Sequence, residues 1–454
     1  MTDTYRVVFF VGLVGALFLS VAIGTVGAQS APDCSTANYD GSGTSDDPYE
    51  VGDIDQLQCI GNEETETELN DSYLQTDDID ASATGDWNKK DEFTEGLSNS
   101  LGGSEGEQFK LAYSPVDELL DTDGVEVELV DSEEGIIELR EETDGGFDVT
   151  YRVEEEIPVG FDPIGERSSP TEDTEFTGTF DGSGNTITGL TIDRSAEADI
   201  GLFGRTNLGA EITNVGIEAV EITGDGNIGG LVGGSSGTVN GSYVTGEVSG
   251  DGNVGGLIGF NDGTVVESYA AGDVSEKNRV GGLVGLNYGT VTASYATGDV
   301  SGDRWVGGLI GVIGFQNGGT VKESYATGEV TGDDDVGGLV GGNSDGTIKE
   351  SYWDTEATGQ DESDGGTGLT ASEMTGSAVQ DNTQGFDFTE TWVTVTDPDG
   401  YPVLVWQLNE DSAQQTGENG EESDEGEGLP GFGVVAAVIA VVAVTYLRNR
   451  KGDR

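Results

Sequence analysis

The sequence predicts an all-β protein built around a parallel β-helix-like solenoid. The hexamer apolar-Gly-Gly-Leu-apolar-Gly recurs at spacings of 26, 26, 26 and 30 residues. In each repeat, glycine-rich and asparagine-rich turns separate short runs of valine, isoleucine, threonine and tyrosine, which favour strands. Two adjacent glycines in every copy would cost a helix roughly 1 kcal/mol each relative to alanine. One coil of about 26 residues cannot bury its own inner face, so the coils must stack. The hexamers begin at Ile228, Val254, Val280, Val306 and Val336.

The charge of the chain indicates an extracellular environment of high salt. The sequence has 87 Asp and Glu against 18 Lys and Arg, a formal net charge of −69 at pH 7. Self-repulsion of this size opposes a compact state in dilute buffer, whereas at molar salt the Debye length falls to about 3 Å. We therefore interpret the chain as an exported protein of a halophilic archaeon. Acidic disorder is the alternative, and it does not fit the repeats. Nucleic acid is a poor partner for such a field.

Residues 1–28 are predicted to be a secretory signal peptide. A short start ending in Arg6 precedes an apolar run from Val7 to Val26, and small residues follow. This order is typical of signal peptides. We expect cleavage between Ala28 and Gln29, with a retained N-terminal anchor as the alternative.

Residues 29–88 are expected to start and cap the solenoid, and residues 89–159 to form an acidic, β-rich insertion. Cys34 and Cys59, the two cysteines of the chain, lie just inside the exported part. Outside the cell an even count favours a disulfide over free thiols or a metal site. We therefore expect Cys34 and Cys59 to be bonded.

Residues 160–408 are predicted to be the solenoid proper with its C-terminal cap. After each hexamer the sequence continues with Thr-Val or Thr-Ile and then Ser-Tyr. The run from Val280 to Val291 (VGGLVGLNYGTV), followed by SYATG from Ser294 to Gly298, resembles the GLUG repeat family. That family occurs in surface and adhesin-like proteins and is assigned to parallel β-helices, so the resemblance implies the same fold here.

Stacking converts each repeated residue into a column along the solenoid. The acids that follow each Ser-Tyr would face solvent, because a buried unpaired charge is costly. Alternation along the strand would place the tyrosines on the same outer face, as an aromatic strip for sugar rings. Alternatively, the intervening glycine breaks the register and the tyrosines are core residues. The acids are Glu247, Asp273, Asp299 and Glu329, and the tyrosines are Tyr243, Tyr269, Tyr295 and Tyr325.

The C-terminal residues are predicted to attach the protein to the membrane. Residues 409–428, acidic and rich in glycine and glutamine, should form a flexible tether. Residues 429–454 contain Pro430-Gly431-Phe432, an apolar run just long enough to span a bilayer, and a basic tail that would stay in the cytoplasm. Together they resemble the PGF-CTERM sorting signal of archaeal surface proteins. The resemblance implies recognition by an archaeosortase, removal of the helix and transfer to a lipid. A permanent transmembrane helix is the alternative.

No catalytic, cofactor or metal site is expected. The chain has no histidine, which excludes histidine-dependent triads and histidine-ligated metals, including the zinc site of some GLUG-bearing peptidases. Ca²⁺ at the acidic turns 121–124 and 333–335 is the weaker interpretation, because neither turn has the terminal glutamate of an EF-hand loop. Asn70 and Asn240 each begin an Asn-x-Ser sequon, which permits N-glycosylation outside the cell.

The sequence therefore predicts a non-catalytic cell-surface protein, structural or adhesin-like, associated with the plasma membrane or S-layer. Its expected partners are an archaeosortase-type enzyme and an unidentified envelope or glycan ligand. The alternative is a glycan-active β-helix enzyme, because polysaccharide lyases and hydrolases use this fold. Abundant acids make any carboxylate pair uninformative from sequence.

Overall fold

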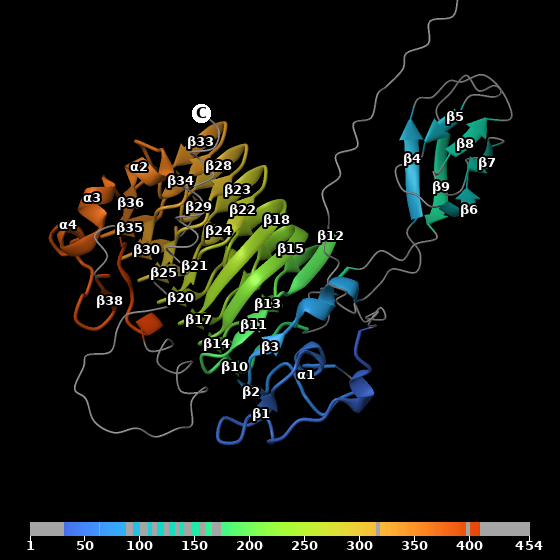
Figure 1. Ribbon diagram of the computed structural model, residues 1–454, viewed down its shortest axis with the longest axis horizontal. Helices are drawn as coiled ribbons and strands as arrows, with labels where there is room; N and C mark the ends of the chain where they lie inside the picture. Colours follow the sequence, from blue (N-terminus) through green and yellow to red (C-terminus); the bar gives the residue numbers. More distant parts are fainter. Residues whose placement is uncertain are drawn as a thin grey trace, which may run out of the picture.

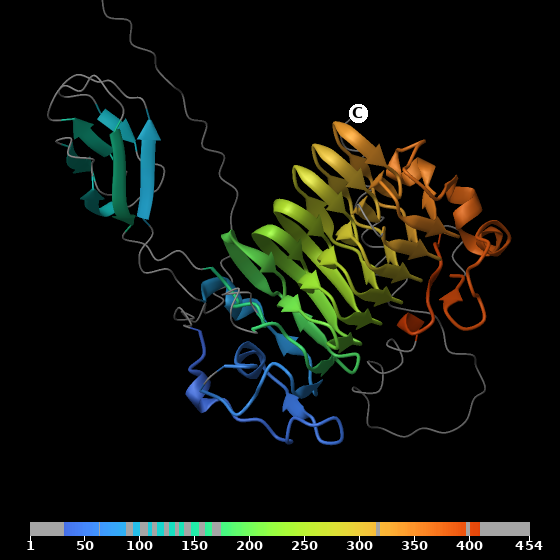
Figure 2. The same cartoon turned by 180° about the vertical axis from the view of Figure 1, so that it is seen from behind.

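The computed structural model describes residues 31–62, 64–87, 159–165, 174–314, 318–395 and 400–408, together with the backbone of six strands between residues 94 and 153. The predicted parallel β-solenoid is confirmed in this part of the chain. Figures 1 and 2 show its coils stacked in sequence order, with the same strand of each coil lying beside its counterpart in the next.

Three parallel sheets run along the stack. The nine-stranded sheet contains β1 (Tyr49–Val51), β2 (Ser72–Gln75), β10 (Thr179–Asp181), β14 (Glu211–Thr213), β17 (Thr238–Asn240), β20 (Thr264–Val266), β25 (Thr290–Thr292), β30 (Thr320–Lys322) and β35 (Thr347–Lys349). The six-stranded sheet contains β13 (Phe203–Thr206), β16 (Val232–Ser235), β19 (Ile258–Asn261), β24 (Val284–Asn287), β29 (Ile310–Ile313) and β34 (Val340–Asn343).

The sixteen-stranded sheet forms the remaining side, and its strands are long in the early coils and divided in the later ones. It contains β3 (Ile79–Asp80), β11 (Thr186–Thr188), β12 (Thr191–Ile200), β15 (Gly216–Gly229), β18 (Tyr243–Gly255), β21 (Tyr269–Ala270), β22 (Asp273–Ser275), β23 (Asn278–Gly281), β26 (Tyr295–Ala296), β27 (Val300–Ser301), β28 (Arg304–Gly307), β31 (Tyr325–Ala326), β32 (Val330–Thr331), β33 (Asp334–Gly337), β36 (Tyr352–Asp354) and β37 (Thr367–Leu369).

The register between coils follows the sequence repeat. Thr264 pairs with Thr290 although they are 26 positions apart, and Thr290 pairs with Thr320 across the 30-residue copy. The extra residues of that copy lie between the end of β29 and the start of β30. The pairing of both adjoining sheets is therefore unchanged by the longer copy.

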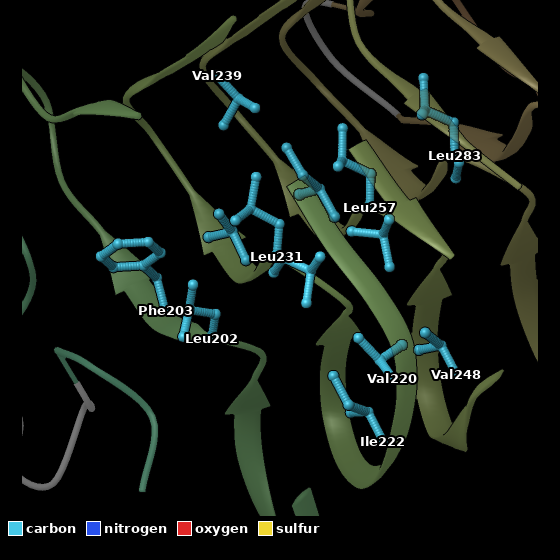
Figure 3. Close-up of a cluster of buried hydrophobic side chains, with 14 of the residues drawn as sticks. Leu202, Phe203, Val220, Ile222, Leu231, Val239, Val248, Leu257 and Leu283 are labelled. Carbon is cyan, nitrogen blue, oxygen red and sulfur yellow. The ribbon is translucent and has the colours of Figure 1, made fainter. Parts of the chain in front are cut away.

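The core lies inside the coils and is supplied by the hexamer. Val254, Leu257 and Ile258 of one copy are all 0 % exposed, and the leucines of successive copies point inward in Figure 3. The second glycine of the hexamer is required by the stacking distance. A Cβ added to Gly282 would overlap the carbonyl oxygen of Gly308 in the next coil.

Both ends of the stack are covered by irregular segments. The N-terminal cap contains the 3-10 helices η1 (Cys34–Thr36) and η2 (Ser82–Asp86) and the helix α1 (Ile54–Gln58), and Cys34 is bonded to Cys59. After the last coil come α2 (Thr355–Thr358), α3 (Ala371–Met374), the 3-10 helix η3 (Gly376–Ala378), α4 (Val379–Asn382), and the antiparallel pair β38 (Trp392–Val393) and β39 (Val403–Leu404).

The strands between residues 94 and 153 differ from the coils in being antiparallel. One three-stranded sheet has the order β4-β9-β6 and the other the order β5-β8-β7. The six strands are β4 (Thr94–Asn99), β5 (Gln108–Lys110), β6 (Val116–Asp121), β7 (Val127–Asp131), β8 (Ile136–Leu139) and β9 (Phe147–Val153).

Candidate functional site

The repeated tyrosines form a continuous stack on the sixteen-stranded sheet. Successive rings are 4.9 Å apart, and their planes differ by 2° to 3°. Tyr295 and Tyr325 belong to an apolar cluster that is separate from the core inside the coils. The rings therefore point away from the coil interior, as strand alternation implies. The stack consists of Tyr243, Tyr269, Tyr295 and Tyr325.

The chain's own C-terminal segment covers this stack. Trp406 lies against Tyr243 and Tyr269, with ring centroids 6.3 and 5.9 Å apart, and Trp392 lies 5.6 Å from Tyr325. Tyr325 is only 1 % exposed. Burial raises the pKa of its phenol well above the ordinary value, which keeps the hydroxyl protonated as the donor to the carbonyl of Pro402, 2.6 Å away.

The structure corrects the interpretation of the tyrosines as an exposed strip for sugar rings. The ring faces, which a sugar would need, are occupied by the neighbouring tyrosines, and the ring edges are covered by tryptophans. Tyr243, Tyr295 and Tyr325 are buried and Tyr269 is half-buried, beneath the C-terminal segment and not inside the coil as the alternative expected.

The carboxylate column lies on the solvent side of the coils. Glu247, Asp273 and Asp299 are exposed, and Glu329 is half-buried. The amide of Asp299 donates to the carboxylate of Asp273 at 3.0 Å, and the amide of Glu329 donates to that of Asp299 at 2.9 Å. These acids therefore hold neighbouring coils together while remaining hydrated.

A groove of about 510 Å³ crosses several coils near the corner between the six-stranded and nine-stranded sheets. Leu208, 85 % exposed, comes from an early coil, and Tyr288 comes from a later one. Between them the lining is mainly glycine and threonine, because the turn before each Thr-Val carries no large side chain. The threonines, in register with one another, are Thr238, Thr264, Thr290 and Thr320.

The groove is poor in charge on a very acidic molecule. Glu211 and Asp262 are the ionisable acids among its lining residues. No hydrogen bond joins the hydroxyls of its four threonines to another residue in the described ranges, so these groups can bond to a ligand. Sequence reasoning missed the groove. The signal available was the Gly-Thr pair that recurs before each Val or Ile.

The two sequon asparagines, Asn70 and Asn240, are both exposed. In the second sequon, the serine is buried and hydrogen-bonded within the solenoid. Ser242 is 0 % exposed, and its hydroxyl donates to the carbonyl of Asn240 and accepts from the amide of Val215. Glycosylation of both asparagines remains a prediction.

The predicted processing sites lie outside the described residues. These sites are the junction of Ala28 and Gln29 and the tripeptide Pro430-Gly431-Phe432. In the described ranges, no helix is both long and apolar enough to span a bilayer, and no cluster of three or more metal-binding side chains occurs. Calcium binding at residues 333–335 remains untested, and residues 122–126 are not described.

Comparison with known proteins supports both resemblances. A model of the GLUG motif matches residues 278–301, which run from β23 into β27, and a model of the PGF-CTERM motif matches residues 429–451. The chain carries both motifs. The PGF-CTERM motif, at the C-terminal end of a β-solenoid, marks an exported, surface-anchored protein.

Halomucin of Haloquadratum walsbyi (strain DSM 16790 / HBSQ001) is 31 % identical over 233 residues. The match covers 50 % of this chain and 2 % of halomucin, so this chain spans only a small fraction of that relative. No solved structure matches significantly.

Proposed function

We propose that this GLUG-bearing protein is a non-catalytic, adhesin-like component of the surface of a halophilic archaeon, which binds an extended neutral glycan in its groove. The groove carries the proposal: it is a long, open, hydroxyl-lined surface with little charge on a chain of net charge −69. A ligand that bonds through hydroxyl groups avoids close like-charge contact with Glu211 and Asp262, which salt screens less than it screens distant charges.

The dimensions of the groove support an extended ligand. Its threonines occupy four successive coils, and adjacent coils in a parallel stack are about 4.8 Å apart. A polymer lying along the solenoid axis would therefore meet one hydroxyl per coil, and the ring of Tyr288 offers an apolar contact for a sugar face. The similarity to halomucin, a protein of a halophile, supports the surface of a halophilic archaeon as the setting.

The glycan proposal is tested with the mature chain in molar KCl and a panel of neutral and acidic polysaccharides. We expect neutral polymers to bind, and Tyr288→Ala and Thr264→Val to weaken binding at least several-fold. Thr347→Val is the matched control, because Thr347 belongs to the same column but does not line the groove. Absence of binding, or equal binding by Thr264→Val and Thr347→Val, would reject the groove. Release of reducing ends would favour the enzyme alternative.

The anchoring proposal is tested at the PGF-CTERM motif. Processing by an archaeosortase should remove the apolar helix after Gly433 or nearby, so surface-exposed protein should lack peptides covering residues 448–454. Phe432→Ala should block processing and leave a full-length membrane form, whereas Glu427→Ala, in the acidic tether just outside the matched motif, should not. Mass spectrometry of envelope protein decides between the outcomes, and C-terminal peptides on the wild-type surface form would indicate a permanent anchor.

A further inference from the structure

We infer that the C-terminal segment formed by residues 370–395 and 400–408, named the clasp below, carries the load from the membrane anchor into the middle of the solenoid. The inference rests on the proposed anchoring and goes beyond it, because it assigns a mechanical role to the residues that cover the tyrosine stack. In Figure 1 the clasp lies beside the last coils, from α3 and α4 to β38.

The clasp runs backward along the stack after the last coil. The hydroxyl of Tyr352, in the last coil, donates to the carbonyl of Gln384 at 2.8 Å. Nearer the end of the clasp, Gln407 bonds to the hydroxyl of Tyr295, two coils earlier, at 2.8 Å. The indole of Trp406 donates at 2.9 Å to the carbonyl of Glu267, in a still earlier coil.

The point at which the chain leaves the solenoid follows from this path. The described clasp ends at Leu408, directly after Trp406 and Gln407, and the sequence continues into the acidic tether and the PGF-CTERM motif. A pull from the anchor therefore acts first on Trp406 and Gln407, which are held by inner coils. It does not act first on β37, the short terminal strand.

Pulling directly on β37 would be mechanically weaker than pulling through the clasp. β37 has three residues and pairs with β36 over three positions. Peeling it would expose Trp353 and Leu339, which are buried at the end of the core. The contacts of the clasp with the tyrosine stack, by contrast, are ring packing and hydrogen bonds between uncharged groups. Salt does not screen such contacts as it screens ion pairs.

The inference is tested by single-molecule force spectroscopy of the mature chain in molar KCl, held near Gln29 and pulled beyond Leu408. We expect the first event to release the clasp, with a gain in length on the order of 100 Å for its extended chain. Trp406→Ala and Gln407→Ala should lower the force of this event by a third or more. Trp305→Ala, which removes a half-buried tryptophan outside the clasp, should leave it unchanged.

A second attachment point tests whether the load runs through the clasp or whether the variants only weaken the protein locally. In Lys349→Cys, a handle is attached at the exposed end of β35, the last strand of the nine-stranded sheet. The load then enters the stack directly and bypasses the clasp. This handle should give a lower first force and steps of one coil. Equal forces at the two handles, or coil-sized first steps when the wild type is pulled beyond Leu408, would overturn the inference. Failure to bind glycans would reject the groove and leave the load path intact.

Discussion

At the scale of single residues, one buried hydroxyl serves two coils. Ser268 is 0 % exposed, and its hydroxyl donates to the carbonyl of Val266 in its own coil at 2.8 Å. The same oxygen accepts from the amide of Ser242 in the preceding coil at 3.2 Å. The pattern repeats with Ser294 and Ser324. The Ser of each Ser-Tyr pair therefore gives a partner to a backbone amide that the stack would otherwise bury without one.

Ser268→Ala should lower the free energy of unfolding by about 1–3 kcal/mol, because it leaves the buried amide of Ser242 without that partner. Ser275→Ala is the control, because Ser275 is exposed in the same coil. Denaturant unfolding in molar KCl measures both. Equal stabilities of the two variants would show that the serine column contributes no net stability.

The carboxylate of Glu276 lowers the stability of the folded state at neutral pH. It is half-buried, one carboxylate oxygen is buried without a hydrogen-bond partner, and burial raises the pKa of its carboxyl above the ordinary value. Because the folded state holds the proton more tightly than the unfolded state, stability is lost as pH rises from the ordinary glutamate pKa through the raised one.

Glu276→Gln should therefore be more stable than the wild type at pH 7, and the difference should shrink as the pH falls to 4. Glu247→Gln removes the same charge from an exposed site and should gain less. Melting temperatures across this pH range provide the test. A stability gain for Glu276→Gln that does not depend on pH, or one no larger than that of Glu247→Gln, would contradict this account.

At the scale of one coil, glycine sets how closely its neighbours approach. Gly298 stacks on Gly272, and a Cβ at Gly298 would overlap the carbonyl oxygen of Gly272. The clash is with backbone, which cannot rotate away as a side chain can. The Gly of the repeated Tyr-x-x-Gly pattern is therefore a requirement of the coil spacing and not of chain flexibility.

Gly298→Ala should destabilise the solenoid by about 1–3 kcal/mol, the usual range for overpacking. Gly85→Ala is the control, because a Cβ there meets only ordinary contacts with Thr191. Thermal unfolding followed by far-UV circular dichroism reports the loss of strands. A Gly298→Ala protein as stable as the control would mean that the coils can separate without cost.

At the scale of the whole molecule, charge sets the conditions in which the fold is stable. With 87 acids and 18 basic residues, most carboxylates can have no basic partner. The ion pairs in the described residues are few, and the pair of Arg304 with Asp335 at 3.0 Å is itself half-exposed. Exposed carboxylates such as Glu247 and Asp273 therefore repel one another unless ions screen them.

The melting temperature should rise steeply with KCl between low and molar concentration. Circular dichroism melts in a KCl series measure the effect. A second series at constant ionic strength, with the acids partly neutralised at lower pH, separates screening from specific ion binding. A melting temperature that does not change with KCl would refute the halophilic interpretation.

The repeat itself was sufficient to predict the coil, its register and the inside of the stack. Val254 and Leu257 recur with the period of the coil, so stacking places each of them in its own buried column. The exposure of Asp273 follows from the cost of burying charge. The surroundings of Tyr243 could not be predicted in this way. A local period determines which residues stack and on which face, but not whether that face meets solvent. That depends on Trp406, far away in a segment without the repeat, and only the tertiary structure brings the two together.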